Sequence, residues 1–165
     1  RIMVRNCAEL GSLLKKIMSR LTANQNLLKL LYYTDKDPFS QKDISNDIIK
    51  KEIFDKLIKI TPRISPRETE GANSLVAITL VNGLQTENGE FRNIRLKIDS
   101  FVPMTQWFIK DENLRPFLIM GEIEKSLKGK TINGIGKIRG GDFSLDFLTE
   151  ETTCYTQGFE ITTYD

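Results

Sequence analysis

The apolar residues near the N-terminus recur at helical spacing. Between residues 10 and 21 they stand three and four positions apart, with Lys15, Lys16 and Arg20 among them. This spacing predicts an amphipathic helix that turns its apolar side to a core. The three bases lie between the apolar positions, so they are expected on its solvent side.

Two further helices are predicted before the first strand. Leucines crowd together in residues 25–33, and isoleucines and a phenylalanine recur on one side over residues 48–58. The later helix must end near residue 61, because Pro62 disfavours helical backbone at the residue before it. Asn6 is placed to cap the first helix.

From residue 74 the period changes from helical to alternating. Residues 74–82 and 91–102 read as strands, and Asn88-Gly89 between them indicates a hairpin. Residues 113–128 return to helical spacing. The second half of the chain is therefore expected to hold a hairpin followed by one helix and more strands.

The C-terminal part is strand-like. Residues 132–138, 143–147 and 155–164 carry the expected apolar alternation. Turns or bulges are predicted at Gly134, Gly136, Gly140 and Gly141, since glycine is the usual residue at positive φ. The whole chain is predicted to form one domain with this layout: residues 1–60 mainly helical, 74–102 strands, 113–128 helix, 132–164 strands.

This order of elements predicts an α+β fold. Alternating strands need one apolar face covered, so the expected architecture is an antiparallel or mixed sheet packed by helices on one face. The other sheet face must meet water in a monomer or a neighbouring subunit in an assembly.

Composition is that of a folded globular protein, but charge is distributed unevenly. Hydrophobic residues make up 39% and charged residues 28% of the 165 residues. Residues 1–30 hold six bases and one acid, whereas residues 142–165 hold six acids and no base. The alternatives are two solvated faces, or complementary surfaces that meet head to tail between subunits.

The sequence offers no set of catalytic residues. Histidine is absent, which removes Ser-His-Asp and Cys-His arrangements, and Cys7 and Cys154 lack the spacing of metal ligands. No cofactor is expected, and the protein is predicted not to be an enzyme. No apolar run approaches the length of a membrane span, so the protein is expected to stay where it is made.

Two stretches leave alternatives open. Asp142, Asp146, Glu150 and Glu151 could hold Mg²⁺, as in a small nuclease, or form an exposed acidic face. The bases of the first helix could contact DNA phosphates, although they are not interleaved with aromatic residues.

The stretch from Phe101 through Pro103 to Trp107 is rich in aromatic and apolar residues. Such residues anchor both cores and interfaces, so packing within the chain and contact with a neighbouring subunit are both open. Pro103 indicates that the preceding strand ends there or lies at an edge.

Five segments resemble a known family: residues 94–103, 114–127 and 156–161, together with 30–38 and 140–145. The first three are similar in layout to the tail-terminator and neck family of tailed phages, and the last two look like virion proteins of long-tailed phages of Gram-positive hosts. The pattern covers nearly the whole chain.

What the resemblance implies is a structural virion protein that forms a hexameric ring on top of the tail tube. The implied partners are copies of itself, the tail-tube protein and a head connector or neck protein, with DNA passing only transiently through the lumen. The implied location is the host cytoplasm during assembly and then the virion. Residues 27–60 add two helical segments that a typical small terminator lacks, and these could cover the outside of the ring or meet a contractile sheath.

The rival interpretations remain a connector or stopper, a tail-completion or baseplate component, a metal-dependent nuclease and a DNA-binding protein. Candidate subunit-contact or lumen residues are Lys15, Lys16, Arg20, Phe101, Pro103, Trp107, Glu150 and Glu151.

Overall fold

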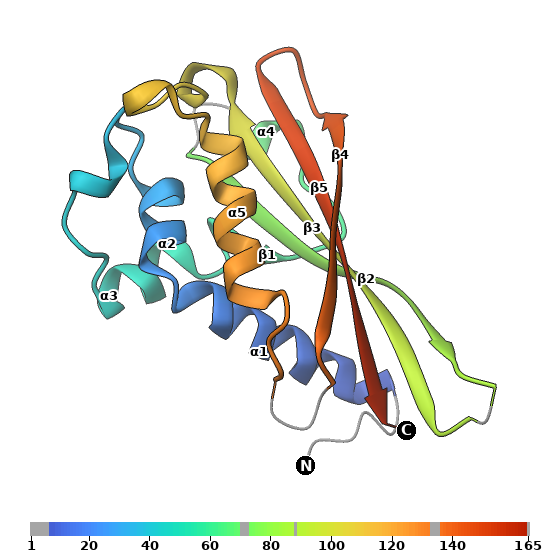
Figure 1. The fold of residues 1–165 in the computed structure, drawn as a ribbon. Helices are drawn as coiled ribbons and strands as arrows, with labels where there is room; N and C mark the ends of the chain where they lie inside the picture. The colour runs from blue at the N-terminus through green and yellow to red at the C-terminus, as the bar shows by residue number, and fades with distance from the viewer. Residues whose placement is uncertain (1–6, 70–72, 88, 133–135, 165) are drawn as a thin grey trace.

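Five strands form one mixed sheet in the order β1-β2-β3-β5-β4 (Figure 1). The computed structural model describes residues 7–69, 73–87, 89–132 and 136–164. All neighbouring strands are antiparallel except β1 and β2, which are parallel. The strands are β1 (Ile58–Ile60), β2 (Leu75–Gln85), β3 (Phe91–Pro103), β4 (Ile138–Phe147) and β5 (Thr152–Tyr164).

Helices pack mainly on one face of this sheet, as the sequence predicted. The α-helices are α1 (Leu10–Thr22), α2 (Gln25–Tyr32), α3 (Asn46–Ile48), α4 (Pro66–Thr69) and α5 (Arg115–Leu127). Buried side chains of α1, α2 and α5 share one core with Ile94, Leu96 and Ile98 of β3. The alternation predicted for this strand is confirmed, and so is the inward position of Phe159 and Ile161. The fold is therefore of the predicted α+β class.

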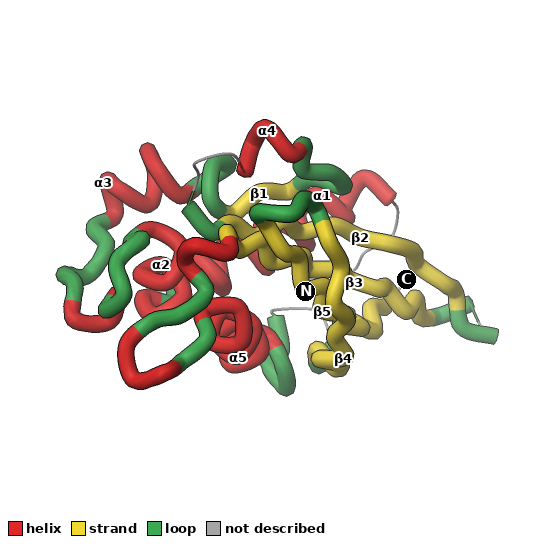
Figure 2. The backbone as a smooth tube through the Cα atoms, turned by 90° about the horizontal axis from the view of Figure 1, so that it is seen from above, coloured by secondary structure: helices red, strands yellow, loops and turns green. Residues whose placement is uncertain are grey.

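The other sheet face is covered only in part. Figure 2 shows α4 on the side of the sheet away from α5, and the loop before α4 contributes Ile64 to a small second cluster. Phe101 and Cys154 belong to that cluster. Most of the rest of this face is polar, with Lys97 paired to Asp99 at 3.0 Å, although Leu84 near the end of β2 is an exposed apolar residue on it. The free face expected from the sequence is thus closed at one end and open at the other.

The helix predicted over residues 48–58 is wrong in its second half. A π-turn over Ile49–Ile53 follows α3, and Phe54 is extended. Asp55 has φ of 60°, which ends the helical path, and β1 follows. Pairing with β2 outweighs the helical pattern, because Ile58 is buried in the main core when it lies in a strand.

The strand predicted over residues 132–138 is wrong where it can be judged, because β4 begins only at Ile138; residues 133–135 lie outside the described part. The proposed cap Asn6 and the glycine turn predicted at Gly134 also lie outside the described residues. The bulge at Gly140 and Gly141 is confirmed, since both have φ near 112° and the register with β5 shifts there.

A buried arginine joins the helical layer to the β3–α5 connection. Arg115 has no exposed surface, and its guanidinium donates to the carbonyls of Gln106, Leu30, Tyr33 and Asp35 at 3.0, 2.6, 2.8 and 2.6 Å. Burial lowers the pKa of Arg115 to about 10, which leaves it charged at neutral pH. The carbonyls of Leu30 and Tyr33 are at the C-terminal end of α2, where a cation opposes the helix dipole.

The two cysteines should react at very different rates. Cys7 is exposed, whereas burial, aided by the charge of Asp99, raises the pKa of Cys154 to about 12. The thiolate is the reactive form, so one thiol per chain is expected to react with a maleimide at neutral pH. Intact mass should show a single adduct in the native protein and two after denaturation. A Cys7→Ser variant that still takes up label rapidly would contradict the burial of Cys154.

Candidate assembly interface

Three large apolar side chains of β4 are exposed on the same side of the sheet as α5. Phe143, Leu145 and Phe147 have 63%, 48% and 71% of their surface accessible. Phe143 is opposite Gln157 of β5, whose side-chain amide donates to the carbonyl of Met120 in α5 at 3.2 Å, which fixes the side on which these residues point.

Tyr155 of β5 is the centre of an aromatic group next to them. Its ring centroid lies 5.4 Å from Phe117 of α5, 6.3 Å from Phe143 and 6.2 Å from Trp107. Trp107 also donates its indole N–H to the Thr153 hydroxyl at 3.0 Å. Such ring pairs are worth about 0.5–1.5 kcal/mol each beyond the burial of their surface.

The helices leave this region open, because α5 runs over the centre of the sheet while β4 lies at its edge (Figure 1). A groove of about 540 Å³ lies between the β3–α5 connection and the end of β4, and it is lined by Met104, Trp107, Leu145 and Phe147, among others. We call the exposed residues Met104, Phe117, Phe143, Leu145 and Phe147 the apolar surface. Contiguous exposed apolar surface is typical of binding sites.

The outer edge of β4 pairs with no other strand in the described part of the chain. Exposed edge strands offer unpaired backbone N–H and C=O groups to other chains. The bulge at Gly140 and Gly141 interrupts only the beginning of β4, so residues 142–147 remain regular. An open edge and the apolar surface therefore lie together on one strand.

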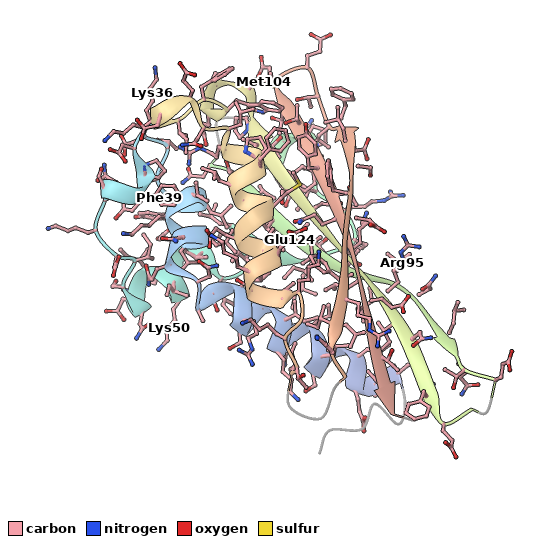
Figure 3. The ribbon with its side chains drawn as sticks, in the orientation of Figure 1. Lys36, Phe39, Lys50, Arg95, Met104 and Glu124 are labelled. Atoms are coloured by element: carbon pink, nitrogen blue, oxygen red, sulfur yellow. The ribbon has the colours of Figure 1, made fainter. Side chains whose placement is uncertain are left out.

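Two predicted acidic residues lie at one end of this region. Glu150 and Glu151 are exposed in the turn between β4 and β5. Glu150 lines the groove, and the backbone carbonyl of Glu151 accepts from the Met104 N–H at 2.8 Å. Figure 3 shows Met104 at this same end of the molecule. The carboxylates form an acidic rim beside an apolar groove.

The predicted basic residues lie elsewhere. Lys15 and Arg20 are exposed on α1, and Lys16 is half-buried there. In Figure 1 this helix is at the opposite end of the sheet from the β4–β5 turn. The structure therefore separates these bases from Glu150 and Glu151 within one chain.

The stretch from Phe101 to Trp107 divides between core and surface. Phe101 is 6% exposed in the second cluster, so it packs within the chain. Pro103 is the last residue of β3 and is half-buried, as is Trp107. Only Pro103 and Trp107 of the three are accessible to a neighbour.

Acidic residues do not converge on a metal-binding group. Within the described residues, no three histidine, cysteine or acidic side chains come together in this way. Asp142 and Asp146 project from the face of β4 away from α5, whereas Glu150 and Glu151 are in the turn. No α-helix in the described ranges is long and apolar enough for a membrane span.

Sequence reasoning missed the apolar surface. The alternation of residues 143–147 predicts a strand with one apolar face, but alternation does not say whether a helix covers that face. Phe117 lies within the helical pattern of residues 113–128, and that pattern does not reveal that 45% of its surface is exposed. The available signal was the number of aromatic residues in a strand near the C-terminal edge of the fold.

No curated protein matches this chain significantly. The model of the YomW family matches residues 24–162, which include α2 to α5, β1 to β4 and most of β5. The family name is derived from a phage, which hints at a phage-associated protein. By this match over most of its length, the chain belongs to the YomW family.

Proposed function

We propose that this chain is a structural phage protein that forms a ring at the top of the tail, ends polymerisation of the tail tube and joins the tail to the head. The observation that carries the proposal is the apolar surface along the open edge strand β4. The phage-derived family name supports the setting.

A ring suits a surface of this kind. Phe143, Leu145 and Phe147 lie at one side of an asymmetric sheet, so a contact with a different surface of the next copy is heterologous. Heterologous contacts close into rings when the rotation between copies closes. Burial of three large apolar side chains, at about 1.5–3 kcal/mol each, favours such a contact.

The proposed partners are copies of this chain, the tail-tube protein and a head connector, with assembly in the host cytoplasm and a final place in the virion. The chain acts by binding and not by catalysis. Glu150 and Glu151 are proposed to face the lumen, where their charge repels the phosphates of passing DNA.

The proposal predicts that a charge on the apolar surface abolishes assembly. Phe147→Asp is expected to shift the sedimenting species from ring to monomer, because a buried unpaired carboxylate is costly. The fold should persist, since Phe147 is 71% exposed in the single chain. The same variant should fail to restore infectious tails when it replaces the wild-type protein in the phage.

Phe39→Asp is the matched control. Phe39 is 41% exposed and lies across the helical layer from β4 (Figure 3). The Phe39→Asp variant should assemble as the unsubstituted protein does. Unchanged assembly of Phe147→Asp, with circular dichroism showing a folded chain, would contradict the proposal.

A further inference from the structure

We infer that neighbouring copies join by strand pairing, with β4 of one copy against the exposed half of β2 in the next, so that one sheet continues across subunits. The inference rests on the self-assembly proposed above and specifies its contact.

At each of the two lateral edges of the sheet, a stretch of strand is available for pairing, and the two stretches are of similar length. On one side, residues 142–147 of β4 have no outer partner strand in the described part of the chain. On the other side, β1 pairs only with Val76, Ala77 and Ile78 of β2. Residues 79–84 continue beyond it past the start of α1, with a shift of register against β3 between Leu80 and Asn82, toward the tip of the β2–β3 hairpin (Figure 1).

Strand direction favours this pairing. From β2 through β3 and β5 to β4, each strand is antiparallel to its neighbour, so β4 runs opposite to β2. When copies in a ring share the same orientation, β4 of one copy is antiparallel to β2 of the next. The junction therefore repeats the pattern inside each chain, and antiparallel pairing forms readily between separate segments.

On the face of the sheet that faces the helices, the side chains at both edges are apolar and so suit contact with each other. Leu80, Gly83 and Ile94 line a groove there with Cys7 and Leu10, ahead of α1 and at its start. Phe143, Leu145 and Phe147 of β4 point to the same side of the sheet. Strand pairing would place these apolar side chains over the groove of the next copy, where water is displaced from both.

On the opposite face of the sheet, the two edges carry side chains of opposite charge. Asp142 and Asp146 of β4 are exposed there, and so is Arg95 of β3, which is adjacent to β2. Arg95 lines one pocket with Asp142 of its own chain, and Figure 3 shows its side chain pointing away from the helices. In a continued sheet, β4 and the next copy's β3 are two strand spacings apart, about 10 Å. An arginine side chain can reach a carboxylate across that distance.

Disulfide cross-linking tests the pairing. In a Cys7→Ser background, Ser144→Cys on β4 is combined in turn with Thr79→Cys, Asn82→Cys or Leu84→Cys on β2, which samples three registers on the same sheet side. Cys154 stays in place because it is buried. At least one double variant is expected to give a ladder of covalent oligomers on mild oxidation, with each single variant remaining a monomer in denaturing gels.

Three results would overturn the inference in different ways. A covalent dimer from Ser144→Cys alone would indicate two-fold pairing between β4 strands. Rings in native mass measurements without a ladder from any double variant would leave the proposed function standing and exclude this contact. Absence of any assembly by the unsubstituted protein, both alone and with the tail-tube protein, would contradict the proposed function itself.

Discussion

Replacing Arg115 by methionine is expected to lower the free energy of unfolding by about 4 kcal/mol, measured by urea denaturation. Methionine fills much of the same space but leaves four backbone carbonyls without the guanidinium donors. The loss of these hydrogen bonds should outweigh the relief of removing a buried charge. The segment that follows α2 should also become more accessible to protease, because Arg115 holds the carbonyls of Tyr33 and Asp35.

Arg67→Met is the matched control, since Arg67 is exposed on α4. Its effect should stay within about 0.5 kcal/mol. Arg115→Lys should recover only part of the stability, because an ammonium group cannot reach the same set of acceptors in a planar fork. A stability of Arg115→Met within about 1 kcal/mol of the unsubstituted protein would show that the buried network contributes little net free energy.

Gly140→Ala is expected to cost about 3 kcal/mol of unfolding free energy. A Cβ at Gly140 would lie 2.5 Å from the Gly158 carbonyl oxygen and 2.9 Å from the Phe159 Cα, and φ is 113°. Both contacts are with backbone atoms of β5, so the bulge would have to move. The expected consequence is weaker pairing of β4 and loss of the edge on which assembly depends.

Gly121→Ala is expected to change the free energy of unfolding in the opposite direction. Gly121 is inside α5, and a Cβ there meets nothing within 4 Å. The substitution should raise stability by about 0.5–1 kcal/mol, because alanine favours helix. If thermal unfolding showed equal effects for the two variants, the strain assigned to the bulge would be wrong.

The elements with the clearest periodicity were the ones that the sequence predicted. The helix over Gln25–Tyr32 and the alternation of β3 agree with the structure, because one face of each is buried almost completely. The helix prediction over residues 48–60 is wrong in its second half for a physical reason. A short apolar run is compatible with either a helix or a strand. Residues 58–60 form a strand because they pair with β2, which lies further along the chain and so is not part of the local pattern.

The candidate interface could be predicted only in part. The composition pointed to Trp107 and to the acidic turn at Glu150, which the structure brings together at one groove. It did not reveal that Phe143 and Phe147 are exposed, because that depends on where α5 crosses the sheet. No local pattern indicates that Arg115 is buried. Three of the four carbonyls that accept from its guanidinium are 80 or more residues away along the chain.

The most direct test of the assembly account is the mass of the purified protein over a range of concentrations, alone and with the tail-tube protein, followed by imaging of any large species. The account predicts a closed ring, expected to be a hexamer, with a central hole of about 20 Å or more, wide enough for a DNA duplex. A strict monomer at every concentration and with the tail-tube protein present would contradict it.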